Sequence, residues 1–518
     1  MSAWTTLRRR SVLLGAASVA AMAPRLGHAQ RNEALRVVQP WEIRSLLPGP
    51  DGTAITRMGY AETLVAADPD GRIVPALATH WAADEQGTTW RFRIREVATF
   101  HDGTRVTAAN VAASFERLLP TSLYASRAGI RSISVEDGTL VVTQAAPFGP
   151  LLAHLTDPSC AVMAPAAFDG QARPGRPISA GPYRIVSSDA PRGVVLARHE
   201  QPWRPLSPFA ELRFDAAVNG ETRANIAVAG DAGLVFNIPT PAIQRLSALR
   251  SMRVDRSIIP RTHILMPNAA LPQFATAELR RALSLAVDRA AIASGIMRNP
   301  ALAATQYVPP PLSEWHDSTL APLRHDPAVA NRVLDDAGWR RGGDGVRVKD
   351  GVRYAGLVRT FANRPELPII ATALQQQFRA IGFELTIRVG EWPAIYEGQR
   401  DGTLELALSS RNLAIVPDPV STIATDFTTD ASPPGAVGQT NWRHLGPRRD
   451  VDAYTASFDE RAKARLRRAI VGVLQDELPV VPIVWYDQLV AVSNRFFGFL
   501  NDPFEQRLHL DRIQVRQG

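Results

Sequence analysis

The sequence contains very little cysteine and very little lysine. Its single cysteine, Cys160, excludes an internal disulfide, and we expect it to be a small buried apolar residue rather than a reactive thiol. The only two lysines are Lys349 and Lys463, so arginine carries almost all of the positive charge. After residue 30 there is no apolar run of the roughly 20 residues that a membrane span needs, and we expect a soluble mature chain.

Catalytic and metal-binding signatures are missing as well. The sequence has no Gly-x-Ser-x-Gly elbow, no phosphate-binding loop, no dinucleotide-binding glycine motif and no His-Glu-x-x-His pair. None of its ten histidines lies three to five residues from another, so no helix-borne metal site is predicted. His101-Asp102-Gly103 is typical of a tight turn. We therefore expect a binding protein without a cofactor, and an exported hydrolase is the weaker alternative.

The first thirty residues have the composition of an export signal. Arg8, Arg9 and Arg10 precede the uncharged, mostly apolar segment Ser11–Pro24, and small residues lead to a predicted cleavage site after Ala29. The arginine pair favours the twin-arginine route, with an ordinary general-secretory signal as the alternative. The residue after the cleavage site is glutamine rather than cysteine, which excludes a lipid anchor there. We therefore predict a periplasmic protein.

Charge and length limit what the mature protein can be. The formal net charge is +8, and the signal removes four arginines and no acid, which leaves +4. A charge this small gives no reason to expect a nucleic-acid partner. The 518 residues, of which 45% are hydrophobic and 21% charged, are typical of a globular protein with more than one domain.

The remainder of the chain alternates predicted strands and helices, which indicates an α/β fold. Trp90–Arg95 and Phe383–Val389 alternate as half-buried strands do, and Val480–Tyr486 is apolar throughout, as in a strand buried on both faces. Apolar spacing and capping residues predict five helices. These run from Thr107 to Pro120, over Glu278–Ile296 after a Thr276 cap, from Asp326 to Gly338, over Pro365–Ile381, and from a Ser457 capping box to Glu477.

A series of short segments then points to one family. The segments are Tyr60–Val65, Gly71–Trp81, Thr89–Arg95, Phe100–Thr104, Thr107–Val111, Ala180–Tyr183, Arg280–Leu283, Val287–Arg289, Asp326–Pro327, Ala337–Trp339, Leu478–Ile483 and Phe497–Phe499. In order and spacing they resemble family 5 of the extracytoplasmic solute-binding proteins of ABC transporters, which includes dipeptide, oligopeptide and nickel binders. The resemblance covers residues 35–500, with Asn110 in place of the family's usual acid.

The resemblance implies a two-lobed periplasmic binding protein of type II, similar to the large cluster C members. Residues 1–29 would be the signal, 30–262 with 481–518 the first lobe, and 263–480 the second. An extra subdomain at about 47–177 would belong to the first lobe. The implied function is the capture of a peptide-like or other small polar solute and its delivery to an inner-membrane ABC permease with its ATPase. We expect a monomer, and a receptor-like or chaperone-like binder without a dedicated permease is an alternative.

The resemblance also implies that the ligand lies between the lobes, where polar groups at strand ends make contacts. Arg411 and Asn412 follow the apolar strand Leu404–Leu408, and we predict that they bind a carboxylate and orient an amide or carboxyl. For Arg411 the alternative is an ion pair within the fold. Asp418, between two prolines, is predicted to form a turn or to bind an ammonium group.

Further candidates come from both lobes. Trp392 and Tyr396 are predicted to form an aromatic wall, with core packing as the alternative. The remaining predicted ligand contacts are Asn363, Arg364, Tyr60 and Glu62. Two departures from the family pattern leave the solute open among peptides, opines, glutathione, sugars and metal chelates. The segment before Asp418 lacks the acid found in some peptide binders. Val420 follows Pro419, so a nickel-binding histidine pattern does not transfer.

Overall fold

The computed structural model describes residues 33–49, 52, 54–122, 127–168, 177–362, 364–428 and 440–516. One compact unit spans Asn32–Gly518. The predicted signal peptide and the candidate residue Asn363 lie outside the described residues. Among the described residues, no helix has both the length and the apolar character of a membrane span.

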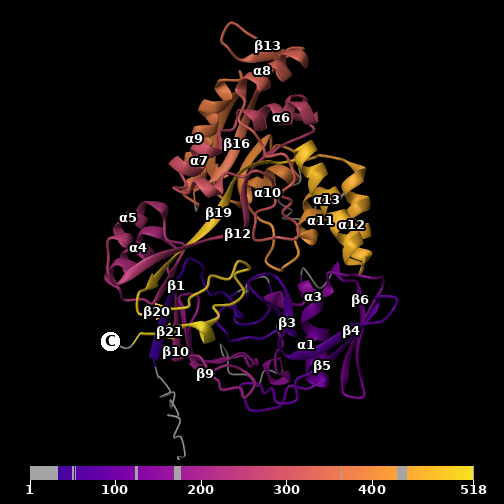
Figure 1. The fold of residues 1–518 in the computed structure, drawn as a ribbon, viewed down its shortest axis with the longest axis vertical. Coiled ribbons are helices and arrows are strands. Elements are labelled where there is room, and N and C mark those ends of the chain that lie inside the picture. The colour runs from indigo at the N-terminus through magenta and orange to yellow at the C-terminus, as the bar shows by residue number, and fades with distance from the viewer. Residues whose placement is uncertain are drawn as a thin grey trace, which may run out of the picture. The chain divides into compact units, whose positions relative to one another are not determined.

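A ten-stranded sheet runs through the molecule in the order β17-β16-β18-β12-β19-β11-β1-β10-β9-β8 (Figure 1). Parallel pairs join β1 to β10 and β11, and β16 to β17 and β18, whereas β12 is antiparallel to both β18 and β19. The strands are β1 (Glu33–Gln39), β8 (Tyr183–Asp189), β9 (Gly193–Arg198), β10 (Phe209–Ala216), β11 (Leu234–Phe236), β12 (Met252–Pro267), β16 (Ala355–Phe361), β17 (Glu384–Gly390), β18 (Leu406–Asn412) and β19 (Val481–Ser493).

Three hydrophobic cores lie along this sheet among the described residues. The mid-chain core consists mainly of buried residues between Ile264 and Trp485, and the N-terminal core consists of buried residues between Leu35 and Phe236 together with several between Val490 and Val515. A third core contains Met252 of β12, Leu489 and Ala491 of β19 and buried residues between Val38 and Leu246. β12 and β19, which have 16 and 13 residues and pair over most of their length, therefore run from the mid-chain core into the cores of the N-terminal half.

Helices pack around the mid-chain core. On α9, Leu367, Ile370, Leu374 and Phe378 are fully buried, as the apolar spacing predicts for the last three. The helices of this part are α6 (Ala277–Ala286), α7 (Arg289–Gly295), α8 (Pro327–Asp336), α9 (Glu366–Arg379), α10 (Pro393–Arg400), α11 (Val420–Phe427), α12 (Leu445–Ala456) and α13 (Glu460–Glu477). Beside α8, the short strands β13 (Arg340–Arg341), β14 (Arg347–Lys349) and β15 (Val352–Arg353) form a small sheet.

A four-stranded sheet in the order β4-β5-β7-β6 has its own small-sheet core with α1. Thr107 caps α1 as predicted, and Asn110 completes the capping box in place of the family's acid. These elements are β4 (Ala78–Ala83), β5 (Thr89–Ile94), β6 (Ile130–Glu136), β7 (Thr139–Gln144), α1 (Ala108–Leu118) and α3 (Leu151–His154). β20 (Phe496–Phe497) and β21 (Gln514–Val515) contribute to the N-terminal core, whereas α4 (Gly220–Ala229) and α5 (Ile243–Ser247) pack in the third core. The remaining short strands are β2 (Val65–Ala67) and β3 (Ile73–Pro75).

Two of the helix predictions are wrong in detail. The segment Glu278–Ile296 is not one helix, because Val287 is extended and the Asp288 side chain accepts a hydrogen bond from the Ala291 N–H, which starts a second helix. The cap of α13 is Asp459 rather than Ser457. Cys160 is buried as expected, and burial raises the pKa of its thiol to about 12.

Candidate ligand site where the two cores meet

The register of β12 and β18 gathers polar side chains on one face of the large sheet. His263 pairs with Ser410 and Arg261 pairs with Asn412, and directly paired residues point to the same face. Arg261 and His263 interrupt an otherwise apolar part of β12 and are almost fully buried. A charged residue is rarely buried in a central strand without a partner, so the partners of Arg261 show how this face is organised.

Arg261 and Arg57 share one carboxylate. Arg57 Nη2 is 3.5 Å from Glu505 Oε1, and Arg261 Nη2 is 3.3 Å from Glu505 Oε2. Gln488, on β19, donates a third hydrogen bond to Glu505 at 2.6 Å. Burial alone would raise the pKa of Glu505, but the two guanidinium groups outweigh it and lower the pKa. Glu505 is therefore ionised, and each of its two carboxylate oxygens pairs with one arginine.

A second pair lies next to this one on the same face. His263 Nε2 is 3.2 Å from Glu366 Oε1 at the start of α9. Burial lowers the pKa of His263, and the bond to Glu366 only partly opposes that effect, so the imidazole is neutral at pH 7. Since a carboxylate only accepts hydrogen bonds, Nε2 carries the proton. The Arg364 guanidinium stands 5.0 Å above the ring of Tyr486, and Arg261 lies 5.4 Å from the same ring.

We call the five residues Arg57, Arg261, His263, Glu366 and Glu505 the junction cluster. Arg57 belongs to the segment whose Met58 and Tyr60 pack in the N-terminal core, whereas β12 enters the mid-chain core after Arg261. The sequence analysis missed all five residues. Only Arg261, as a charge inside the apolar stretch of β12, gave a local signal.

Arg411 points away from the junction cluster. It pairs with Thr262 across the ladder, on the opposite face, and its guanidinium makes a bidentate pair with Asp426 on α11, at 2.7 and 2.9 Å. Burial raises the pKa of Asp426 to about 6 although Arg411 acts against the shift. Asn412 lies on the same face as Arg261, and its Oδ1 accepts a bond from the Ala414 N–H. This geometry matches the alternative prediction for Arg411, an ion pair within the fold.

The predicted aromatic wall and Asp418 are packed against the mid-chain core. Trp392 makes edge-to-face contacts with Phe361 at 5.0 Å and with Tyr396 at 4.8 Å, and both residues are half-buried. Asp418 is buried, accepts hydrogen bonds from the Tyr454 hydroxyl and from a backbone N–H at the start of α11, and burial raises its pKa. The turn reading of Asp418 fits these contacts.

Glu62 and Tyr60 lie inside the N-terminal half. Glu62 is fully buried and pairs with Arg204 and Arg507. Burial would raise the pKa of Glu62, but the two arginines lower it to about 2. The Tyr60 hydroxyl donates to the Pro177 carbonyl oxygen. Of the predicted ligand residues that the structure describes, Arg364 and Asn412 lie at the junction cluster, and the others have partners elsewhere in the fold.

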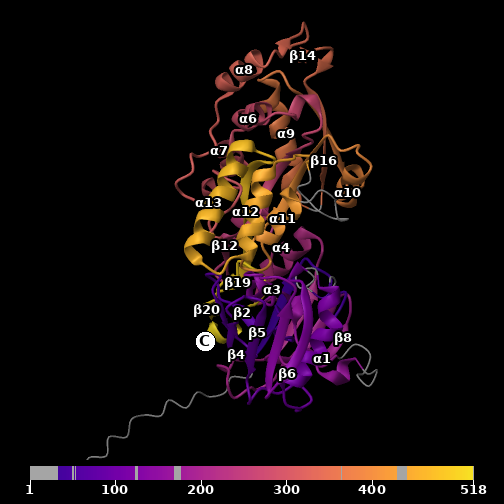
Figure 2. The same ribbon diagram turned by 90° about the vertical axis from the view of Figure 1, so that its right-hand side faces the viewer.

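Several contacts join the mid-chain helices to the small sheet and to the C-terminal segment. The Gly149 N–H donates to the Thr455 carbonyl oxygen at 2.7 Å, and His154 Nε2 lies 2.8 Å from Ser421 Oγ on α11. Phe458, between α12 and α13, lies 6.0 Å from the Trp90 ring. In Figure 2, α12 and α13 lie above the strands of the small sheet. The mid-chain helices therefore contact the small sheet directly.

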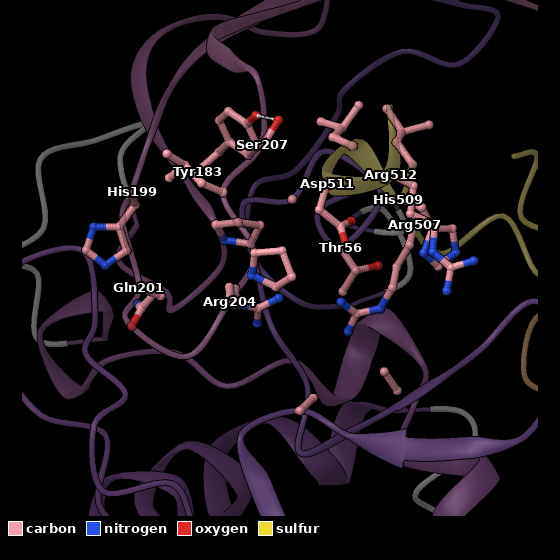
Figure 3. A pocket seen from close by; sticks show the side chains of 18 of the residues that line it. Thr56, Tyr183, His199, Gln201, Arg204, Ser207, Arg507, His509, Asp511 and Arg512 are labelled. Atoms are coloured by element: carbon pink, nitrogen blue, oxygen red, sulfur yellow. Dashed lines mark hydrogen bonds between the residues drawn. The ribbon is translucent and has the colours of Figure 1, made fainter. Parts of the chain in front are cut away.

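A cavity of about 380 Å³ lies beside the junction cluster. Arg57 lines it, and its other walls come from segments within 56–76, 182–207 and 507–512, with no lining residue between 263 and 480. In Figure 3 the side chains of Arg204 and Arg507 point toward one another, in agreement with their shared partner Glu62. The described residues contain no group of three or more His, Cys, Asp or Glu side chains suited to a metal ion.

Comparisons with known proteins agree with this architecture. The profile described as "Bacterial extracellular solute-binding proteins, family 5 Middle" matches residues 72–433. The chain is 24% identical to the nickel-binding periplasmic protein of Escherichia coli (strain K12) over 94% of its length and 95% of that protein's. It is 22% identical to the glutathione-binding protein GsiB of the same strain over 85% of its length and 86% of that protein's.

Solved structures show the same fold. NikA from Brucella suis in complex with Fe(III)-EDTA superposes with a TM-score of 0.82 at 20% identity, over 94% of this chain and all of that one. The oligopeptide-binding protein AppA from Bacillus subtilis, in complex with a nonapeptide, gives 0.76 at 17% identity with the same coverage. The chain belongs to the bacterial extracellular solute-binding proteins, family 5.

Proposed function

We propose that this protein is the periplasmic substrate-binding component of an ABC importer and that it captures a peptide-like or other small polar solute. The solute is held between two lobes, 30–262 with 481–518 and 263–480, and passes unaltered to the permease. The first lobe includes a subdomain at about 47–177. The chain acts as a monomer after removal of a signal peptide that follows the twin-arginine route.

The observation that carries this proposal is the origin of the junction cluster. Arg57 comes from the side of the N-terminal core, while His263 and Glu366 come from the side of the mid-chain core, and β12 and β19 are strands of the large sheet that run from the mid-chain core into the N-terminal half. Bending of these two strands would separate the two sets of residues, and closure would bury a solute between them. The cavity at Arg204 and Arg507 is a weaker candidate because none of its lining residues lies in the proposed second lobe, 263–480.

The relatives support a small polar solute but differ in what their names say they bind: nickel, glutathione or peptides. The junction cluster contains two carboxylates and one neutral histidine, and both carboxylates are already paired with arginine or histidine. This favours an organic solute, or a metal held within an organic chelate, over a bare metal ion. Arg364 and Asn412 are the predicted residues that we assign to the site.

The test is binding of a solute with conserved mass. The mature protein is mixed with the low-molecular-mass ultrafiltrate of yeast extract, and its thermal unfolding and native mass spectrum are recorded. We expect a raised unfolding temperature and a one-to-one adduct, since a ligand at 100 times its Kd stabilises by about 2.7 kcal/mol. Release of the same mass on denaturation is expected for a carrier. An altered mass, or no stabilisation by any ultrafiltrate, contradicts the proposal.

A further inference from the structure

Several guanidinium N–H groups at the junction cluster lack an acceptor. Arg57 Nε and Arg261 Nε and Nη1 are buried and have no hydrogen-bond partner among the residues that the structure describes. The Arg57 side chain is 6% exposed and that of Arg261 is 9% exposed, so bulk solvent hardly reaches these groups. A guanidinium group only donates and keeps its proton in proteins, so only an acceptor satisfies these groups.

Arg57 and Arg261 also share a single carboxylate. Both pair with Glu505, and neither forms an ion pair with another acid among the described residues. Of the neighbouring acids, Glu366 is hydrogen-bonded to a neutral histidine, and the Asp502 carboxylate accepts three backbone N–H bonds in its own loop. Two guanidinium charges therefore stand against one directly paired carboxylate.

The two arginines with unpartnered groups lie close together because they share Glu505, each at a different carboxylate oxygen. An anion placed against both would accept the free N–H groups and add the missing negative charge. A planar carboxylate matches the paired N–H groups of a guanidinium better than a single-atom acceptor does. It would lie at the border of the two proposed lobes, because both arginines belong to 30–262 and Arg261 is two residues from His263 of the second lobe.

We propose that the solute is an organic anion with a net negative charge and that Arg57 and Arg261 bind its carboxylate at the junction between the cores. The proposal deepens the proposed function and rests on it, because it assumes that the junction is where the solute is captured. It assigns the ligand to organic anions such as acidic peptides, opine-like acids or anionic chelates. Neutral sugars and purely cationic solutes would leave the arginine N–H groups unsatisfied.

The experiment separates solutes by charge before binding is measured. The yeast-extract ultrafiltrate is divided at neutral pH on an anion exchanger into a retained and an unretained fraction, and each is tested by thermal unfolding and native mass spectrometry. We expect only the retained fraction to stabilise the protein. Stabilisation by the unretained fraction alone would contradict an anionic solute but would still support capture of a solute. Stabilisation by neither fraction contradicts the proposed function itself.

Variants test the two arginines directly. Arg57→Gln and Arg261→Gln are each expected to weaken binding of the retained solute by 10- to 100-fold, the range for loss of a charged hydrogen bond. If Arg261→Gln does not fold, Arg261→Lys is used instead, because it keeps the charge opposite Glu505. We expect Arg261→Lys to bind the solute at least tenfold more weakly, because the paired N–H groups of the guanidinium are gone. Arg192→Gln, at an exposed pair with Asp189, is the matched control. Binding equal to the unsubstituted protein in the Arg57 and Arg261 variants would overturn the proposal.

Discussion

Replacing Glu62 with glutamine removes the one negative charge from a group of three charged side chains, one carboxylate and two guanidinium groups. The Glu62 side chain is 0% exposed, and its two oxygens pair with Arg204, which follows β9, and with Arg507, near the C-terminus. Glutamine keeps the size of the side chain but leaves both guanidinium groups without their counter-charge. Breaking such a buried pair from one side costs about 3–5 kcal/mol.

The pKa of Glu62 gives a second estimate of the same quantity. The folded protein lowers it from 4.5 to about 2, and one unit corresponds to about 1.36 kcal/mol, which gives about 3 kcal/mol. Because the folded-state pKa is the lower one, this stabilisation is fully present above pH 4.5 and is lost as the pH falls toward 2. By the same linkage, the contribution of Glu62 to the free energy of unfolding falls from about 3 kcal/mol at pH 7 to about 1 kcal/mol at pH 3.

Urea unfolding of the original protein and of Glu62→Gln at both pH values measures this difference. We expect the variant to be less stable by about 3 kcal/mol at pH 7 and the gap to narrow at pH 3, because protonated glutamate resembles glutamine. Glu136→Gln is the control, since its pair with Arg91 is about half exposed and is expected to contribute less than about 1 kcal/mol. Equal stability at pH 7, or a gap that does not change with pH, would refute the reasoning.

Two further predictions concern the mid-chain helices and their contact with the small sheet. Arg411→Ala leaves Asp426 buried without its bidentate partner, so we expect a loss of about 3–5 kcal/mol in urea unfolding, and a loss below 1 kcal/mol would contradict the pairing. In Gly87→Ala the new Cβ would lie 2.2 Å from the Phe458 ring, so we expect weaker solute binding in a thermal-shift titration. Gly138→Ala has a similar positive φ but open space, and it should bind as the original protein does; equal binding by both variants would contradict a role for this contact.

Local patterns predicted most helices because their ends are set by neighbouring residues. Thr107 and Asp326 cap α1 and α8 by accepting backbone N–H bonds three residues ahead, which the sequence shows directly. The break between α6 and α7 was missed because apolar residues continue at helical spacing up to Val287, which hides the new cap at Asp288. The family resemblance supplied the two-lobed architecture, which local spacing does not contain.

The site was much less predictable from the sequence. Glu62 was expected to contact a ligand, but its partner Arg507 lies 445 residues away, and no local pattern reports such a pair. Arg411 has the chemistry of a carboxylate binder, yet the register of β18 turns it toward Asp426. Arg261 and Glu505 come together only because β12 and the C-terminal segment meet in the fold. Which face a strand residue occupies is set by pairing with distant strands.

A distance measurement between the two cores tests the central claim most directly. Val218→Cys and Ile369→Cys place spin labels at positions 68% and 55% exposed, one beside each core, while the native Cys160 is buried. Double electron–electron resonance then compares the labelled protein with and without the anion-exchange-retained fraction. The account predicts that the distance distribution shifts and narrows when the solute binds. An unchanged distribution, with solute binding shown by a raised unfolding temperature, would contradict capture between two moving lobes.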